Sequence, residues 1–284
     1  MPAGYSIMLI NSIHPDTEKR MNPSQYTALQ LWFDAYVTPF CNTDPEGQRN
    51  IRLKIDHTRR VCDNMHLLTA GEGLAPEDSL IAASIALLHD VGRFPQYRRW
   101  RTFRDSQSDN HARLSVDVIR EHNILNSLNA DERLLIEEAV RFHNLLAVPQ
   151  QLKSASSDFL RLIRDADKLD IWRVFLEYFT TPEEERASAT MLGLADLPGV
   201  SNLCLEQLSA GRIVRLESVT CINDFKLLLI SWVYDLNFST SYRLVDESDY
   251  LHDLALLLPD RDDIATAICS AQTHIALKVA AFSP

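Results

Sequence analysis

The sequence predicts an all-α protein. Glycine is sparse, with 8 in 284 residues, and sustained alternation of apolar and polar residues, which is typical of strands, is nearly absent. Apolar residues instead recur at i, i+4 and i+7 in segments bounded by helix-capping residues. We therefore expect a helical bundle with an additional helical C-terminal subdomain.

The chain divides into three predicted parts. Residues 1–22 lack the basic start and long apolar core of a signal peptide, and we expect a loosely ordered leader. Residues 23–181 form the main helical domain, and residues 182–284, which begin with a charged stretch, form the C-terminal subdomain packed on it.

Individual helices are predicted from the apolar periodicity and the capping residues. In the main domain they cover residues 24–40, 50–70, 75–88, a segment with His111 in its first turn, 130–146 and 156–179. An arginine-rich loop is expected over residues 92–108. In the C-terminal subdomain the predicted helices cover residues 201–210, 222–236, 247–258 and 261–281.

Charge and cysteine usage limit the function classes. The net charge is −11, which argues against general nucleic-acid binding but permits a local basic pocket for a small phosphate. The 5 cysteines are odd in number and include no C-x-x-C pair, so we expect reduced thiols in a cytoplasmic protein. No apolar run suggests a membrane span, and a homo-oligomer is left open.

One ordered set of histidines and aspartates carries the chemistry. Each histidine on an apolar helix face would, taken alone, be read as a core residue. Together, so many buried polar groups around one core require a compensating cation. Mixed imidazole and carboxylate ligands suit Mn, Fe, Co, Ni or Zn. The set consists of His57, His89, Asp90, His111, His143 and Asp165.

Three segments resemble the HD-domain superfamily of metal-dependent phosphohydrolases. They are "KIDHTRRV", "LLHDVGR" and "LIRDADKLD", and the resemblance covers roughly residues 50–180. It implies that His57, His89, Asp90 and Asp165 hold one metal. It also implies that His111 and His143 complete a second site, with Asp90 bridging the two ions. In the alternative, mononuclear reading these two histidines only line the cleft.

The resemblance implies hydrolysis of a phosphate by a metal-bound hydroxide. Besides Asp90, the expected catalytic residues are Arg93 and Lys168, both as contacts for the charged phosphate oxygens. Arg93 lies three residues after Asp90, where many family members carry a basic residue, and Lys168 lies one helical turn after Asp165. The alternatives are a surface position for Arg93 and a simple ion pair for Lys168.

The remaining arginines of the loop are candidates for substrate binding. Arg98 and Arg99, with Arg101 and Arg104 nearby and aromatic residues interleaved, could form a lid over the substrate. The alternative is that they pair with surface carboxylates.

The predicted function is hydrolysis of a nucleotide or another small phosphate ester or anhydride. The cyclic-dinucleotide phosphodiesterase branch is disfavoured, because "RFHNLLAVP" has one histidine followed by Asn144 instead of a doubled histidine. Two alternatives use the same ligands: a di-iron oxygenase of the superfamily, and a non-catalytic, metal-stabilised ligand-sensing protein.

Overall fold

The computed structural model describes residues 20–41, 44–190 and 193–282. Throughout these residues the chain is helical, with no β-strand beyond an isolated bridge between Ala195 and Cys221. The all-α prediction is therefore confirmed. Of the predicted leader, residues 1–19 lie outside the described part of the chain. Its last residues are packed: Met21 is buried, and its backbone N–H donates to Glu132 Oε1 at 2.7 Å.

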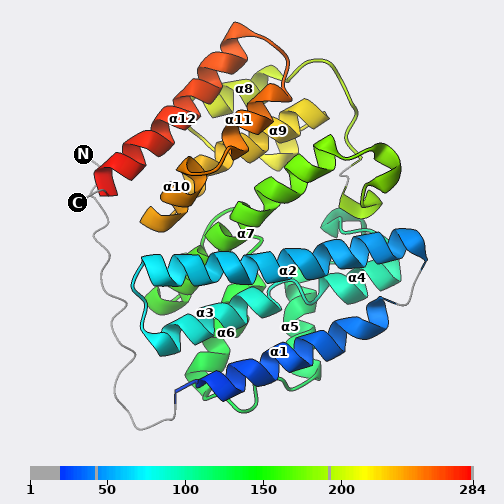
Figure 1. Ribbon diagram of the computed structural model, residues 1–284, viewed down its shortest axis with the longest axis vertical. Helices are drawn as coiled ribbons and strands as arrows, with labels where there is room; N and C mark the ends of the chain where they lie inside the picture. Colours follow the sequence, from blue (N-terminus) through cyan, green and yellow to red (C-terminus); the bar gives the residue numbers. More distant parts are fainter. Residues whose placement is uncertain (1–19, 42–43, 191–192, 283–284) are drawn as a thin grey trace.

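The helix α7 lies at the centre of the molecule, between the preceding helices and the C-terminal ones (Figure 1). The helices up to this point are α1 (Pro23–Val37), α2 (Pro45–Gly71), α3 (Pro76–Leu88), α4 (Arg93–Trp100), α5 (His111–Glu121), α6 (Ala130–Phe142) and α7 (Ser154–Thr180). Those after it are α8 (Asn202–Ser209), α9 (Ile222–Ser231), α10 (Ser239–Asp246), α11 (Tyr250–Leu256) and α12 (Asp262–Phe282).

The arginine-rich segment is partly helical, which corrects the predicted loop over residues 92–108. Helix α4 occupies its first half, because Phe94 and Tyr97 form a buried i, i+3 stripe beneath the arginines. Pro95 in the first turn is compatible with a helix start. The helix ends at Arg101, whose φ of 55° lies in the left-handed region. The arginines therefore project from a helix, which disperses them in different directions.

Helix α10 is a second element that the periodicity did not predict. The first residues of this eight-residue helix are polar, and the side chains of Thr240 and Ser241 are buried. It contacts α2, α7 and α12. Gly71 at the end of α2 leaves room for Thr240, because a Cβ at Gly71 would overlap the threonine side chain. Helix α10 therefore connects the C-terminal subdomain to two helices of the main domain.

A buried ionic cluster joins α7 to the short turn η6 (Trp232–Asp235). Asp235 Oδ2 accepts from Arg164 at 2.5 Å and from Lys168 Nζ at 2.6 Å. The side chains of Arg164 and Lys168 are only 7% and 10% exposed. Burial, together with the Arg164 charge, lowers the pKa of Lys168. Asp235 therefore balances two cations that are largely removed from water.

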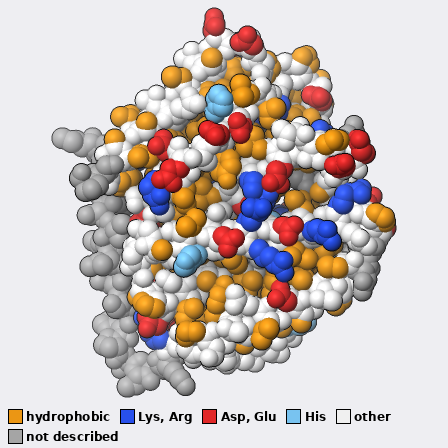
Figure 2. All heavy atoms as spheres, viewed as in Figure 1, with side chains coloured by type: hydrophobic (Ala, Val, Ile, Leu, Met, Phe, Trp, Pro, Cys, Tyr) orange, Lys and Arg blue, Asp and Glu red, His pale blue; other side chains and the backbone are white. Residues whose placement is uncertain are grey.

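Helix α12 is, among the described helices, the one that is long and apolar enough to cross a membrane by length and composition. Ile264, Ile268 and Ile275 are nevertheless buried, on a face that packs on α8 and α10. Length and composition do not distinguish such a packed helix from a membrane span. On the face of the molecule in Figure 2, acidic, basic and hydrophobic side chains are interspersed.

Replacing Asp235 by Asn should lower the free energy of unfolding by about 3–5 kcal/mol, because Arg164 and Lys168 would stay buried without their carboxylate. Urea unfolding followed by circular dichroism measures this change. The control is Asp246→Asn, an exposed position, which should change stability by less than about 0.5 kcal/mol. Equal stability of D235N and wild type would show that this cluster does not hold the two parts together.

Candidate metal centre

Four histidines from four helices meet in one buried cluster. His57 lies within α2, and His111 is the first residue of α5. His89 and His143 directly follow α3 and α6, so each is carried at a helix end. All of them are less than 7% exposed. Helix packing therefore brings together imidazoles that are up to 86 positions apart, from 57 to 143 in the sequence.

The Nδ1 atom of each histidine contacts an oxygen, which fixes the direction of the ring. With Nδ1 engaged in this way, Nε2 is the atom left to face the centre of the cluster. The four contacts are His57 Nδ1 to Asp170 Oδ2 at 2.7 Å, His89 Nδ1 to the Ala86 carbonyl at 2.8 Å, His111 Nδ1 to Asp105 Oδ2 at 2.7 Å and His143 Nδ1 to the Val140 carbonyl at 2.8 Å.

The donor atoms form two overlapping groups. His57, His89 and Asp167 make one group, and His89, Asp90 and His143 make the other, each with its donor atoms within 4.8 Å of one another. His57 Nε2 lies 3.1 Å from Asp167 Oδ1. His111 joins the second group, because its Nε2 lies 3.1 Å from that of His143.

Asp90 lies between the two groups and directs one oxygen to each. Its Oδ2 is 3.6 Å from His57 Nε2 and 3.8 Å from His89 Nε2. Its Oδ1 is 3.6 Å from His111 Nε2 and 3.9 Å from His143 Nε2. A carboxylate with this placement can bridge two cations.

The donor set fits a divalent transition metal. His89 Nε2, Asp90 Oδ1 and Asp167 Oδ1 are buried atoms without a hydrogen bond among the described residues, although Arg93 and His57 lie near the two carboxylate oxygens. Burying polar atoms without a partner is unfavourable, and a cation at this point would satisfy all three. Imidazole nitrogens mixed with carboxylate oxygens are the ligands of Mn, Fe, Co, Ni and Zn.

Asp165, the predicted ligand, is not part of this cluster, and Asp167 lies there instead. Two residues along a helix correspond to a rotation of about 200°, so the two carboxylates point in nearly opposite directions. Asp165 faces the C-terminal subdomain, where it accepts hydrogen bonds from Asn237 N at 2.9 Å and Ser241 Oγ at 2.7 Å. Burial raises the pKa of Asp165. The other expected ligands, His57, His89, Asp90, His111 and His143, are brought together.

Arg93 lies at the cluster, as the sequence predicts. Its Nε is 3.3 Å from Asp90 Oδ1. Its Nη1 donates to the Phe103 carbonyl at 2.6 Å and to Asp105 Oδ1 at 3.1 Å. Arg93 therefore connects the bridging carboxylate to the segment that follows α4.

Lys168, Arg98 and Arg99 are not brought to the cluster. Lys168 is buried against Asp235, on the side of α7 that faces the C-terminal subdomain. Arg98 donates to the Pro39 carbonyl at 3.1 Å, and Arg99 lies 4.5 Å from the centre of the Trp100 ring. These three side chains, which were expected to bind the substrate phosphate, therefore lie away from the donor cluster.

Besides Asp167 and Asp170, two further charged residues at the cluster were not predicted. Lys54 Nζ lies 2.8 Å from Asp90 Oδ2. Asp105 accepts from Asn144 Nδ2 at 3.3 Å in addition to its contacts with His111 and Arg93. For Lys54 the sequence did contain a signal, since it precedes His57 by three residues and so shares its helix face.

Burial and neighbouring groups shift the pKa values of the residues in the centre. Burial would raise the pKa of Asp90, but Lys54 and Arg93 outweigh it and hold that pKa well below its usual range. For Asp105, burial is likewise outweighed by the hydrogen bond with His111, and its pKa falls to about 2. Burial lowers the pKa of His111 and His143 to about 4. At neutral pH these carboxylates are ionised and these two imidazoles are neutral, as metal ligands must be.

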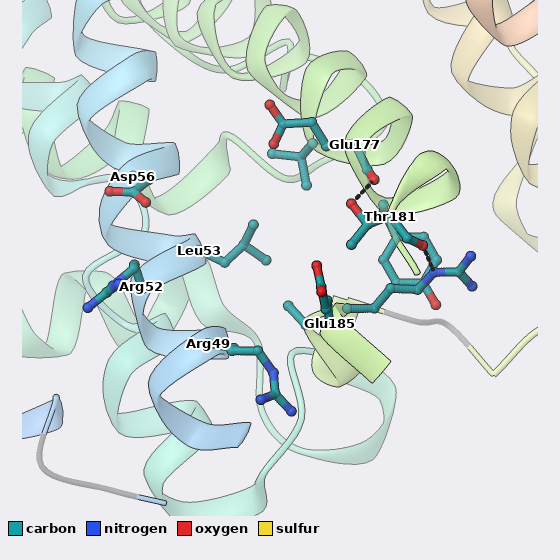
Figure 3. A pocket seen from close by; sticks show the side chains of 11 residues that line it. Arg49, Arg52, Leu53, Asp56, Glu177, Thr181 and Glu185 are labelled. Carbon is teal, nitrogen blue, oxygen red and sulfur yellow. Dashed lines mark hydrogen bonds between the residues drawn. The ribbon is translucent and has the colours of Figure 1, made fainter. Parts of the chain in front are cut away.

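A separate groove of about 250 Å³ lies between α2 and the end of α7 (Figure 3). Arg49, Arg52 and Asp56 line it from α2, and Glu177 and Thr181 line it from α7. No histidine or aspartate of the metal centre is among its lining residues. The groove is therefore distinct from the donor cluster.

Fold and donor set together define a helical metal-binding domain, and a family comparison identifies it. Residues 55–172 match the family described as HD domain. No curated protein and no solved structure matches the chain. Residues 55–172 are therefore similar to the HD domain, in agreement with the resemblance seen in the sequence. The matched range includes the four histidines, Asp90 and Asp167.

Exchanging the two neighbouring aspartates of α7 tests which one is a ligand. Asp167→Asn should weaken Mn²⁺ binding by at least about 100-fold, because it removes a charged donor from the centre. Asp165→Asn, the matched control, should leave Mn²⁺ affinity within about threefold of wild type. Isothermal titration calorimetry with Mn²⁺ measures both. The reverse order of affinities would return the ligand role to Asp165.

The metal-free protein should lose stability as the pH falls from 6.5 to 4. His111 and His143 stay neutral in the folded state down to their pKa of about 4, whereas the unfolded chain binds protons below 6.5. Each therefore contributes a slope of about 1.4 kcal/mol per pH unit in this window. His57 acts with the opposite sign. Burial and the Lys54 charge would lower its pKa, but the contacts with Asp167 and Asp170 outweigh them and raise it, so its stabilisation is present below 6.5 and is lost as the pH rises through the folded value.

Urea unfolding in the presence of a chelator, at several pH values in this window, measures the slope. Burial also lowers the pKa of His89, which adds to the slope in the same direction. The variant His143→Gln removes one of these groups and should reduce the slope by about 1.4 kcal/mol per pH unit. An identical slope in wild type and H143Q would exclude this assignment.

Proposed function

We propose that the protein is a metal-dependent phosphohydrolase that acts on a nucleotide or another small phosphate ester or anhydride, with two metal ions in its centre. The observation that carries the proposal is the position of Asp90, which directs Oδ2 to His57 and His89 and Oδ1 to His111 and His143. A centre for a single ion does not need a carboxylate that faces two donor groups.

Each ion would have its own donors. His57, His89 and Asp167 would hold one ion, His111 and His143 would hold the other, and Asp90 would be shared. Bound divalent metals would polarise the phosphate and lower the pKa of a coordinated water.

The chain itself contributes orientation and charge. Asp170 and Asp105 hold the rings of His57 and His111 through Nδ1, so that the Nε2 atoms stay directed at the metals. Arg93 provides a guanidinium beside Asp90 Oδ1, and its side chain is 14% exposed. A cation at this place supports the binding of a phosphate, whose non-bridging oxygens are negatively charged.

The histidines of the centre are more deeply buried than two of its carboxylates. The histidine side chains are at most 7% exposed, whereas those of Asp167 and Asp105 are 18% and 31% exposed. A substrate would therefore approach along the edge formed by these two carboxylates and Arg93. The small exposure of these side chains favours a small phosphorylated molecule over a polymer.

The proposal predicts that protein loaded with Mn²⁺, Co²⁺ or Fe²⁺ releases phosphate from members of a panel of nucleotides and simple phosphate esters. A chelator should abolish the activity. Asp90→Ala should reduce it by more than about 100-fold, because the shared ligand of both metals is lost. Phosphate release is measured colorimetrically under anaerobic conditions, with the exposed Asp63→Ala on α2 as control.

Two results would count against the proposal. Absence of phosphate release across the panel with every metal would contradict hydrolysis. Consumption of O₂ by the iron-loaded protein, without anaerobic hydrolysis, would instead indicate the oxygenase chemistry that the same ligands can support.

A further inference from the structure

We propose that Lys54 binds the anionic group of the substrate, on the side of the centre formed by His57 and Asp167. This role rests on the proposed phosphohydrolase function. Lys54 lies on α2, one turn before His57, and its Nζ is 2.8 Å from Asp90 Oδ2. That oxygen is the one that faces His57 and His89.

The two cations of the centre lie on opposite oxygens of Asp90. Lys54 is beside Oδ2, and Arg93 Nε is 3.3 Å from Oδ1. Both also lie over the ring of Phe103, at 5.4 Å for Lys54 Nζ and 5.8 Å for Arg93 Cζ. One cation therefore accompanies each donor group, and an anion that spans both groups would have a positive charge at each end.

Lys54 has fewer hydrogen-bond partners than Arg93 among the described residues. Arg93 Nη1 already donates to the Phe103 carbonyl, Asp105 and Gln96, at 2.6, 3.1 and 3.0 Å. Within the described part of the chain, Lys54 Nζ has one hydrogen-bond acceptor, Asp90 Oδ2. An ammonium group has three donors, so two stay available for a ligand.

Accessibility supports the same assignment. The side chain of Lys54 is 16% exposed, close to the 18% of Asp167 and above the values of the four histidines. Part of the Lys54 side chain is therefore accessible to solvent, as part of the Asp167 side chain is. A lysine with this placement binds phosphate as a point charge, without the fixed geometry that a guanidinium requires.

A purely structural role for Lys54 makes a different prediction. If Lys54 only neutralised Asp90, its removal would loosen the carboxylate and weaken metal binding. As a substrate contact, its removal would weaken anion binding and leave metal binding equal or tighter, because a positive charge beside a metal ligand opposes a divalent cation.

The experiment compares wild type, Lys54→Met and Lys54→Arg, with Lys153→Met as a matched control at an exposed position. Inorganic phosphate is titrated calorimetrically into each Mn²⁺-loaded protein, and bound manganese is measured by elemental analysis. We expect K54M to bind phosphate at least roughly 10-fold more weakly, since a charged hydrogen bond is lost, while retaining its manganese. K54R, which keeps the charge, should retain most of the phosphate affinity, and K153M should match wild type.

The outcomes separate the two proposals. Hydrolysis by wild type with equal phosphate affinity in K54M would overturn the role of Lys54 and leave the proposed function intact. Loss of manganese from K54M would also overturn it, because Lys54 would then act by holding Asp90. A wild type that neither hydrolyses the panel nor binds phosphate would refute the proposed function itself.

Discussion

The centre depends on one buried carboxylate. Asp90 is 3% exposed, yet it stays ionised because positive charge lies beside each of its oxygens. Removing a carboxylate from water in this way is unfavourable unless cations and hydrogen bonds compensate it. Lys54, Arg93 and the surrounding imidazoles compensate the buried charge of Asp90. A metal ion on either side would compensate it further.

The ligands are held by two different means. His89 and His143 follow helix ends, and the Nδ1 of each contacts the carbonyl three residues before it, so the backbone itself sets the ring. The rings of His57 and His111 depend on the side chains of Asp170 and Asp105. Two of the four histidines are thus fixed by local helix geometry, and the other two by contacts with aspartate side chains.

The sequence was sufficient for the fold class, most helices and five of the six residues that the structure brings together at the centre, because helical periodicity and residue order are local properties. The sequence did not predict which face of helix α7 carries the ligand. The segment "DADKLD" offers three aspartates, and the choice between Asp165 and Asp167 depends on which face of α7 meets α2. Helix α4 was not predicted because its apolar stripe is short and surrounded by arginines. The pairing of Lys168 with Asp235 was not predicted because the two residues are 67 positions apart in the sequence.

Helix α7 presents polar side chains on two opposite faces. Asp167 and Asp170 face the ligands from α2 and α3, while Arg164, Asp165 and Lys168 are engaged by residues of the C-terminal subdomain. A rigid helix cannot move on one face without moving on the other. The contacts with the C-terminal helices therefore fix the rotation of α7 about its axis and its position along that axis. The position of the metal ligands is thus determined in part by residues more than 60 positions further along the chain.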